Sequence, residues 1–214
     1  MPANGACKSV RVLRFIQNSS DEAIDLIHVR RFYCFRLSLR PIFIHYFFCP
    51  GVITCSVSHA GSLLHRLIQA DITYEYVTPS LSEFRNRITG TLERFPYLVL
   101  EEDGVIQGYA YAGPFHSRAA YSHCCELSIY LDHNAKGRGY GRKLYEALED
   151  NLRGLGFLNL YACIGDPITE DEYLNHNSEQ FHQHLGFTKI GIFHRCGRKF
   201  DRWYNMIYME KLIG

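Results

Sequence analysis

The sequence carries almost no excess charge, since 23 Lys and Arg residues stand against 22 Asp and Glu residues and the formal net charge is +1. Proteins that bind nucleic acid through charge carry a basic patch or stripe, and this balance gives no sign of one. The same balance offers nothing to an anionic membrane surface. We therefore expect no nucleic acid as a partner.

Long apolar segments are scarce as well. The run at residues 41–55 is strongly apolar, but Pro50 and Gly51 interrupt it. It is also shorter than the roughly 20 residues that cross a bilayer as a helix. Residues 1–14 lack the apolar stretch and the small-residue cleavage site of a secretory signal. We expect no integral membrane segment, with a peripheral membrane contact as the minor alternative.

The eight cysteines contain no CxxC pair and show no regular spacing, which argues against a zinc site. Cys124 and Cys125 are adjacent, so in a strand their side chains point to opposite faces and do not share a ligand. Scattered cysteines in apolar surroundings are typical of buried residues in a reducing compartment. We expect a cytoplasmic protein without a bound metal.

Aromatic residues, in contrast, are plentiful, with 15 Tyr and 14 Phe, and a chain of this length can bury a sizeable core. Residues 1–57 mix basic and aromatic stretches without a clean period of 2 or 3.6 residues. From about Ala60 onward the patterns become regular. We expect a helix around residues 63–68 and another at residues 81–88, where Ser80 and Glu83 stand at capping-box spacing.

Strands are expected where apolar residues form short runs bounded by turn residues. The clearest pair is residues 97–101 and residues 105–111, joined by a hairpin turn at Asp103 and Gly104. Antiparallel hairpins with interspersed helices indicate a mixed α/β sheet. Further strands are expected at residues 126–131, 158–163, 189–194 and 204–209, and a short helix at residues 179–185.

A glycine-rich turn lies between the strand at residues 126–131 and a helix that carries Leu144, Leu148, Leu152 and Leu155 on one face. Glycine allows positive φ and close backbone approach, and the start of a helix presents unpaired N–H groups. Because the helix dipole favours acidic residues at that end, basic residues there cost free energy unless a polyanion binds. The alternative is a glycine-rich turn stabilised by Arg142–Glu146 and Lys143–Glu146 pairs. The residues concerned are Gly137, Gly139 and Gly141 with Lys136, Arg138, Arg142 and Lys143.

The turn fits neither the GxGxxG pattern, which would need glycine at position 142, nor the P-loop pattern. Instead, the strand at residues 126–131 followed by Lys136-Gly-Arg-Gly-Tyr-Gly141 resembles the acetyl-CoA motif of the GNAT superfamily. Lys136 stands where Gln or Arg is usual. The chain is most similar to the phosphinothricin acetyltransferase branch, at residues 72–76, 79–85, 108–115, 118–121, 175–187 and 199–203.

The resemblance implies a GNAT acetyltransferase domain over residues 58–214. Its fold would be α/β, with a mixed, mostly antiparallel sheet flanked by helices. Residues 1–57 do not match the family and form an N-terminal extension of unknown structure. Because family members begin with a strand directly before the first helix, it stays open whether this chain has that first strand. The resemblance also implies a homodimer.

Acetyl-CoA is the co-substrate that the resemblance implies. Among the residues that would contact the substrate, Arg118 could pair with a carboxylate through its planar fork. The substrate contacts fall on His116, Arg118, Tyr76 and Tyr121. The acetyl-CoA contacts fall on Ile129, Tyr130, Leu131, Gly137, Arg138, Gly139, Tyr140, Gly141, Arg142 and Asn175.

Transfer of an acetyl group to an amine needs a base, because an ammonium group is not a nucleophile. Glu126 matches the family's candidate-base position, and His182 stands where an acid could protonate the leaving thiolate. From the residues alone, Glu126 could equally be a carboxylate in a salt bridge, and His182 could be a structural histidine.

We therefore expect an N-acetyltransferase for the α-amine of a small amino acid or analogue. Phosphinothricin, methionine sulfoximine and methionine sulfone are the substrates that the resemblance implies. The alternatives are an enzyme for peptide or protein amines, and a catalytically silent CoA-binding protein.

Overall fold

The computed structural model describes residues 9–17, 24–33, 75–135, 137–170 and 174–214. The helix expected around residues 63–68 and the side chain of Lys136 lie outside these described residues. Among them, no helix is both long enough and apolar enough to cross a membrane.

A single sheet forms the centre of the molecule, with the strand order β2-β1-β3-β4-β5-β6-β8-β7. Every neighbouring pair is antiparallel except β5 and β6, which run parallel. The expected mixed, mostly antiparallel sheet is therefore confirmed. Its strands are β1 (Ser9–Gln17), β2 (Ile24–Tyr33), β3 (Tyr97–Glu102), β4 (Val105–Pro114), β5 (Cys124–Leu131), β6 (Asn159–Pro167), β7 (Thr188–Lys199) and β8 (Arg202–Leu212).

The sequence left open whether a first strand is present, and the N-terminal region has two strands, of which β1 lies next to β3. It pairs with β3 from Val10↔Glu102 to Arg14↔Leu98, and Val10 is buried. On its other side β1 pairs with β2. The division of the chain at residue 57 stays a prediction, but these N-terminal strands belong to the same sheet as the rest of the fold.

Local signals explain several of the element boundaries. Helix α2 (Leu81–Leu92) begins after Ser80, whose side chain accepts a hydrogen bond from the backbone N–H of Glu83 at 3.2 Å. This is the expected N-terminal cap. Between β3 and β4, Asp103 and Gly104 have φ values of 50° and 84°, as a tight hairpin turn requires.

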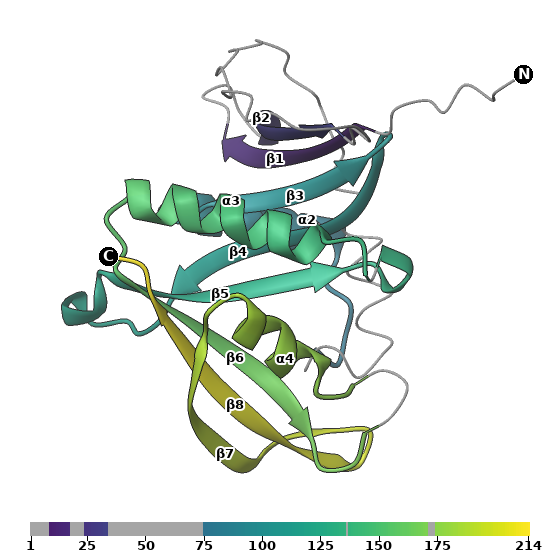
Figure 1. The fold of residues 1–214 in the computed structure, drawn as a ribbon, viewed down its shortest axis with the longest axis vertical. Helices are drawn as coiled ribbons and strands as arrows, with labels where there is room; N and C mark the ends of the chain where they lie inside the picture. Colours follow the sequence, from purple (N-terminus) through teal and green to yellow (C-terminus); the bar gives the residue numbers. More distant parts are fainter. Residues whose placement is uncertain (1–8, 18–23, 34–74, 136, 171–173) are drawn as a thin grey trace, which may run out of the picture.

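Helix α3 (Tyr140–Gly154) packs on one face of the sheet. The side chains of Leu144, Leu148 and Leu152 are fully buried, as their spacing predicts, whereas Leu155 follows the helix and is exposed. In Figure 1, α3 crosses the upper part of the sheet and α4 (Asn177–His184) lies beside β6. Helix α2 lies on the opposite face, where Phe84 contacts Tyr109 of β4.

The two parallel strands separate partway along their length. Pairing runs from Cys124↔Asn159 to Leu127↔Ala162, yet β5 continues to Leu131 and β6 to Pro167. Figure 1 shows β5 and β6 diverging beyond this point. The separation opens the sheet beside the N-terminal end of α3, where Gly141 lies close to Leu131 of β5.

Candidate active site

The glycine turn leads into α3 with the backbone geometry that the sequence predicts. Gly137 and Gly139 have φ values of 75° and 73°, and a Cβ built on either would meet nothing within 4 Å. Gly139 is the N-cap residue, and no side chain of the described residues caps this end of the helix. Its first turn also contains no acidic residue. The turn thus presents helix N–H groups next to open space, which suits a phosphate group.

Arg138 is the best-defined basic residue of this turn. Its Nη2 atom lies 2.7 Å from Oε1 of Glu102 at the end of β3, and its guanidinium lies 4.8 Å from the centre of the Tyr140 ring. Glu102 is largely buried, while Arg138 stays partly exposed. The pair fixes the side chain of Arg138 beside the start of α3. Arg142, on the first turn of α3, is exposed.

Gly141 was predicted to contact the co-substrate, and its surroundings indicate a packing role. A Cβ at this position would lie 2.9 Å from two ring atoms of Phe181 and 3.3 Å from Cδ1 of Leu131. Glycine therefore lets α3 approach α4 and β5 closely. The alternate glycines of the turn thus divide into two kinds, with Gly137 and Gly139 shaping the turn and Gly141 permitting the helix contact.

The residues at the end of β5 point to two faces of the sheet. Ile129 and Leu131 pack against the core under α3. Tyr130 lies on the opposite face, where its ring is 5.1 Å from that of Tyr109. All three follow the last β5–β6 pair, so the backbone that carries them borders the opening between the strands.

Glu126 lies in the paired part of β5, opposite Gly113 of β4 and Tyr161 of β6. It is half-buried, and burial raises the pKa of its carboxyl, while the nearby His116 lowers it. A carboxylate with a raised pKa is a better proton acceptor than a fully solvated one. No ion pair involves Glu126 among the described residues, which favours the predicted base over the salt-bridge alternative.

His182 lies in the interior between α3 and α4, with only 2% of its surface exposed. Its Nε2 is 2.9 Å from the Tyr145 hydroxyl, and its Nδ1 is 2.7 Å from the carbonyl oxygen of Ser178. Burial lowers its pKa to about 4. The rings of Phe181 and Phe187 contact it edge-on. This setting favours the structural alternative over the predicted acid.

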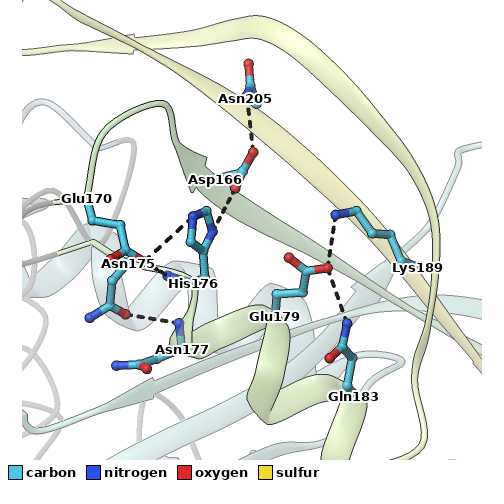
Figure 2. Close-up of polar contacts among 9 residues, drawn as sticks. All are labelled: Asp166, Glu170, Asn175, His176, Asn177, Glu179, Gln183, Lys189 and Asn205. Atoms are coloured by element: carbon cyan, nitrogen blue, oxygen red, sulfur yellow. Dashed lines mark hydrogen bonds and ion pairs between the residues drawn. The ribbon is translucent and has the colours of Figure 1, made fainter.

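Asn175 belongs to the loop that leads into α4, shown in Figure 2. Its Oδ1 accepts a hydrogen bond from the backbone N–H of Asn177 at 3.0 Å. Next to it, Nδ1 of His176 lies 3.2 Å from Asp166 of β6, and Asn205 of β8 donates to the same carboxylate at 3.1 Å. These contacts tie the loop to the far end of β6, near the opening in the sheet.

The predicted substrate contacts separate into two places. His116, Arg118 and Tyr121 are exposed and lie together after β4, where the rings of His116 and Tyr121 are 4.9 Å apart. Beside them, Phe115 stacks on Tyr161 of β6 at 4.0 Å. Tyr76 lies elsewhere, because its hydroxyl donates to the backbone oxygen of Arg198 in β7.

A cavity that the sequence did not predict lies between α2 and the sheet and has a volume of about 620 Å³. Its signal in the sequence was the pair Tyr109 and Tyr111, two residues apart and therefore on one face of β4. The cavity reaches Gly113, the strand partner of Glu126. Its lining includes Glu75, Phe84, Arg87, Tyr97, Tyr109, Tyr111, Gly113 and Tyr130.

Comparisons with known proteins place the chain in one family. The acetyltransferase (GNAT) domain family matches residues 62–208. A phosphinothricin N-acetyltransferase of Alcaligenes faecalis is 34% identical over 151 residues, which cover 70% of this chain and 74% of that protein. An L-methionine sulfoximine/L-methionine sulfone acetyltransferase of Salmonella typhimurium is 35% identical over 116 residues, which cover 54% of this chain and 64% of that protein.

A solved structure is similar to most of the chain. The crystal structure of a GNAT superfamily phosphinothricin acetyltransferase from Sinorhizobium meliloti, in complex with AcCoA, superposes with a TM-score of 0.66 at 30% sequence identity. The match covers 75% of this chain and 86% of that one.

Proposed function

Since this chain belongs to the GNAT family of acetyltransferases, we propose that it moves the acetyl group of acetyl-CoA to the α-amine of a small amino acid or amino-acid analogue. The names of its relatives support this substrate class, because they include enzymes for phosphinothricin and for methionine sulfoximine or sulfone. The observation that carries the proposal is the half-buried Glu126 beside the opening between β5 and β6.

The residues around the opening fit acetyl-CoA. A pyrophosphate would be held by the helix N–H groups after Gly139 and by the basic side chains of Arg138 and Arg142. The pantetheine arm would lie along the backbone of residues 129–131, where β5 has left β6. Asn175 would border the arm from the loop before α4. When bound, acetyl-CoA supplies an activated acyl group with a thiolate as leaving group.

Glu126 is the proposed base. Its carboxylate takes one proton from the substrate ammonium, directly or through a water molecule, and leaves a neutral amine. The amine nitrogen forms a bond to the acetyl carbonyl carbon, and the carbon–sulfur bond breaks. Backbone N–H groups of residues 129–131 would polarise the carbonyl oxygen. The products are the N-acetyl amino acid and the free thiol of CoA, which takes up one proton.

We propose a structural role for His182 rather than a role in this proton transfer. The Ser178 carbonyl oxygen can only accept, so Nδ1 of the neutral ring carries the proton and Nε2 accepts from Tyr145. The ring then has no free proton to give to a thiolate. His182 instead joins α4 to α3, next to the helix end that faces the co-substrate.

Two further features belong to the proposal. We propose a cytoplasmic protein, because Cys124, Cys125, Cys163 and Cys196 are free thiols, as expected in a reducing compartment.

We also propose a homodimer formed through β7, the outermost strand on its side of the sheet. This strand carries large exposed apolar side chains, which monomers rarely gather in one place. They include Ile190, Ile192 and Phe193.

A direct test measures free-thiol release from acetyl-CoA with a panel of amines. The panel contains phosphinothricin, methionine sulfoximine, methionine sulfone, common amino acids and a short peptide with a free N-terminus. Release with the amino acids supports the proposal, and release with the peptide alone contradicts the substrate class. Thermal-shift titration with acetyl-CoA tests the co-substrate separately, because a ligand that binds only the folded state raises the Tm. An unchanged Tm at millimolar acetyl-CoA would contradict every activity that depends on it.

A further inference from the structure

A row of tyrosines forms the sheet-side wall of the cavity between α2 and the sheet. Tyr97 of β3 is the strand partner of Tyr111 of β4, and Tyr109 of β4 is the partner of Tyr130 of β5. The Tyr97 and Tyr111 rings stack at 4.9 Å with 8° between their planes. We call these residues, Tyr97, Tyr109, Tyr111 and Tyr130, the tyrosine row.

Chain order places the proposed base between the tyrosine row and Arg118. Along β4, Tyr109 and Tyr111 come first, then Gly113 opposite Glu126, and Arg118 follows the end of the strand. An amino acid whose amine is at Glu126 has two other groups to place. A carboxylate directed toward the exposed Arg118 leaves the side chain directed into the cavity, against the tyrosine row.

The described lining of this cavity carries no excess positive charge. Arg87 is one of the two cations of this described lining, and two carboxylates hold it: Glu75 at 2.7 Å and Glu83 at 2.6 Å. Arg94 also lines the cavity, and its Nη2 donates to the backbone oxygen of Ser122 at 3.0 Å. An anionic side chain entering here would lose its hydration without gaining an uncommitted cation from the described lining, and this disfavours its binding.

The tyrosine row offers neutral hydroxyl groups. Burial raises the pKa of Tyr97, Tyr109 and Tyr130, so these hydroxyls stay protonated at physiological pH. Tyr111 and Tyr130 are only half-buried, and they are the two members best placed to meet a ligand. A hydroxyl can donate to a neutral oxygen acceptor such as that of a sulfone or sulfoximine, and a sulfur centre packs well against aromatic rings.

We propose that the tyrosine row selects amino acids with an uncharged, oxygen-bearing side chain, of the sulfone and sulfoximine class, over the anionic phosphinate of phosphinothricin. This inference rests on the proposed acetyl transfer at Glu126. It assigns substrate selection to residues of β3, β4 and β5, and it makes the Arg87–Glu75 pair the reason for rejecting the anion.

The first test compares kcat/KM for methionine sulfone and phosphinothricin, using thiol release from acetyl-CoA. We expect the sulfone to be preferred by at least about tenfold, because one unpaired buried charge costs more than 1.4 kcal/mol. A ratio of one or less overturns the proposal. If neither compound is acetylated, the proposed function fails, and the inference is then decided by binding. A higher Tm with phosphinothricin than with methionine sulfone, each with CoA present, contradicts it.

Two variants test the residues. Tyr111→Phe keeps the ring and removes the hydroxyl, so kcat/KM should fall about fivefold or more for methionine sulfone and little for methionine, whose thioether accepts hydrogen bonds weakly. Equal losses for both substrates would indicate a merely structural tyrosine. Glu75→Gln releases Arg87 from one carboxylate and should raise kcat/KM for phosphinothricin relative to the sulfone.

Glu93→Gln is the matched control for the second variant. Glu93 lines the same cavity but is not a partner of Arg87. If both substitutions change the preference equally, overall charge rather than the Arg87–Glu75 pair sets it, and the assignment to that pair is wrong. If only Glu75→Gln shifts the preference, the assignment is supported.

Discussion

The hydroxyl of Tyr145 on α3 lies 2.9 Å from Nε2 of His182 on α4. Both groups are buried, with 1% and 2% of their surfaces exposed. The imidazole has a partner on each ring nitrogen, so this contact joins the two helices through a neutral histidine rather than a charged one. The consequence is a pH dependence of stability.

We expect the free energy of unfolding to fall as the pH drops from about 6.5 to about 4. Burial lowers the pKa of His182 from 6.5 to about 4 in the folded state. Between pH 6.5 and about 4, the imidazole of His182 binds a proton in the unfolded chain but not in the folded chain. Stability that is present above pH 6.5 is therefore lost as the pH falls, until the folded state is protonated as well. The loss from this group is about 3 kcal/mol. Urea unfolding at several pH values measures it.

His182→Gln provides the comparison for this prediction. The variant is less stable at pH 7, and we expect its stability to fall less steeply than that of the unchanged protein between pH 6.5 and 4. Parallel curves would show that other groups cause the fall. The same variant tests the structural role, since kcat per folded molecule should change less than threefold. A loss of a hundredfold or more would restore His182 as the acid.

Glu126→Gln should lower kcat/KM by about 100-fold to 10,000-fold, the usual contribution of a general base. Burial raises the pKa of the Glu126 carboxyl above 4.5, and the base acts only when deprotonated. Activity of the unchanged protein should therefore fall on the acidic side at a higher pH than an ordinary glutamate would give. The variant should lack this limb. An unchanged kcat/KM across the pH range would remove Glu126 from the mechanism.

The sequence predicted the elements whose signals are local. The leucine spacing of α3, the Ser80 cap and the turn at Asp103 and Gly104 each depend on residues within one or two turns of chain, and the structure confirms them. Strand β1 was missed for a physical reason. Its apolar residues do not alternate strictly with polar ones, since Leu13 directly follows Val12 and Ile16 directly follows Phe15, so the sequence lacks the period of 2 that marks a strand.

The cavity could not be predicted because it depends on strand register. Tyr97 is 14 residues from its strand partner Tyr111, and Tyr130 is 21 residues from Tyr109. Only pairing of three strands brings these rings onto one wall. The family motif pointed to Glu126 as the candidate base, but a sequence motif does not show how deeply a side chain is buried. The interior position of His182 therefore emerged only from the packing of α3 against α4.

Alanine substitutions should distinguish the two kinds of glycine in the turn. Gly139→Ala places a side chain at a φ of 73° without a clash, which costs about 1–2 kcal/mol of backbone strain, and it should weaken acetyl-CoA binding. Gly141→Ala forces Phe181 and Leu131 to move, so it should destabilise the fold by about 1–3 kcal/mol. Unfolding and acetyl-CoA titration report the two effects separately.

Gly154→Ala is the control for both variants. It lies in α3, and an added Cβ there meets nothing within 4 Å. Alanine should leave stability equal or higher by about 0.5–1 kcal/mol, with acetyl-CoA affinity unchanged. If Gly139→Ala behaves like this control in both measurements, the turn does not hold the co-substrate as proposed.

Replacing apolar residues of β7 should shift the protein from dimer to monomer. Ile190 and Phe193 are 49% and 55% exposed on the outermost strand. The double variant Ile190→Thr with Phe193→Ser removes this apolar surface, and threonine at position 190 remains compatible with a strand. Light scattering after size exclusion reports the mass. Leu212→Ser is the control, because Leu212 is 72% exposed but lies outside the pairing with β7. A monomeric unchanged protein contradicts the dimer.

The divergence of β5 from β6 has a consequence for backbone motion. The stretch at residues 128–131 has a neighbour in β4 but has lost the one in β6. Amides of this stretch that face the opening should therefore exchange their hydrogens for deuterium faster than those of residues 124–127. A bound pantetheine arm would replace the missing strand and slow that exchange. The opening would thus be a place in the sheet for one more strand, which the proposed co-substrate would fill.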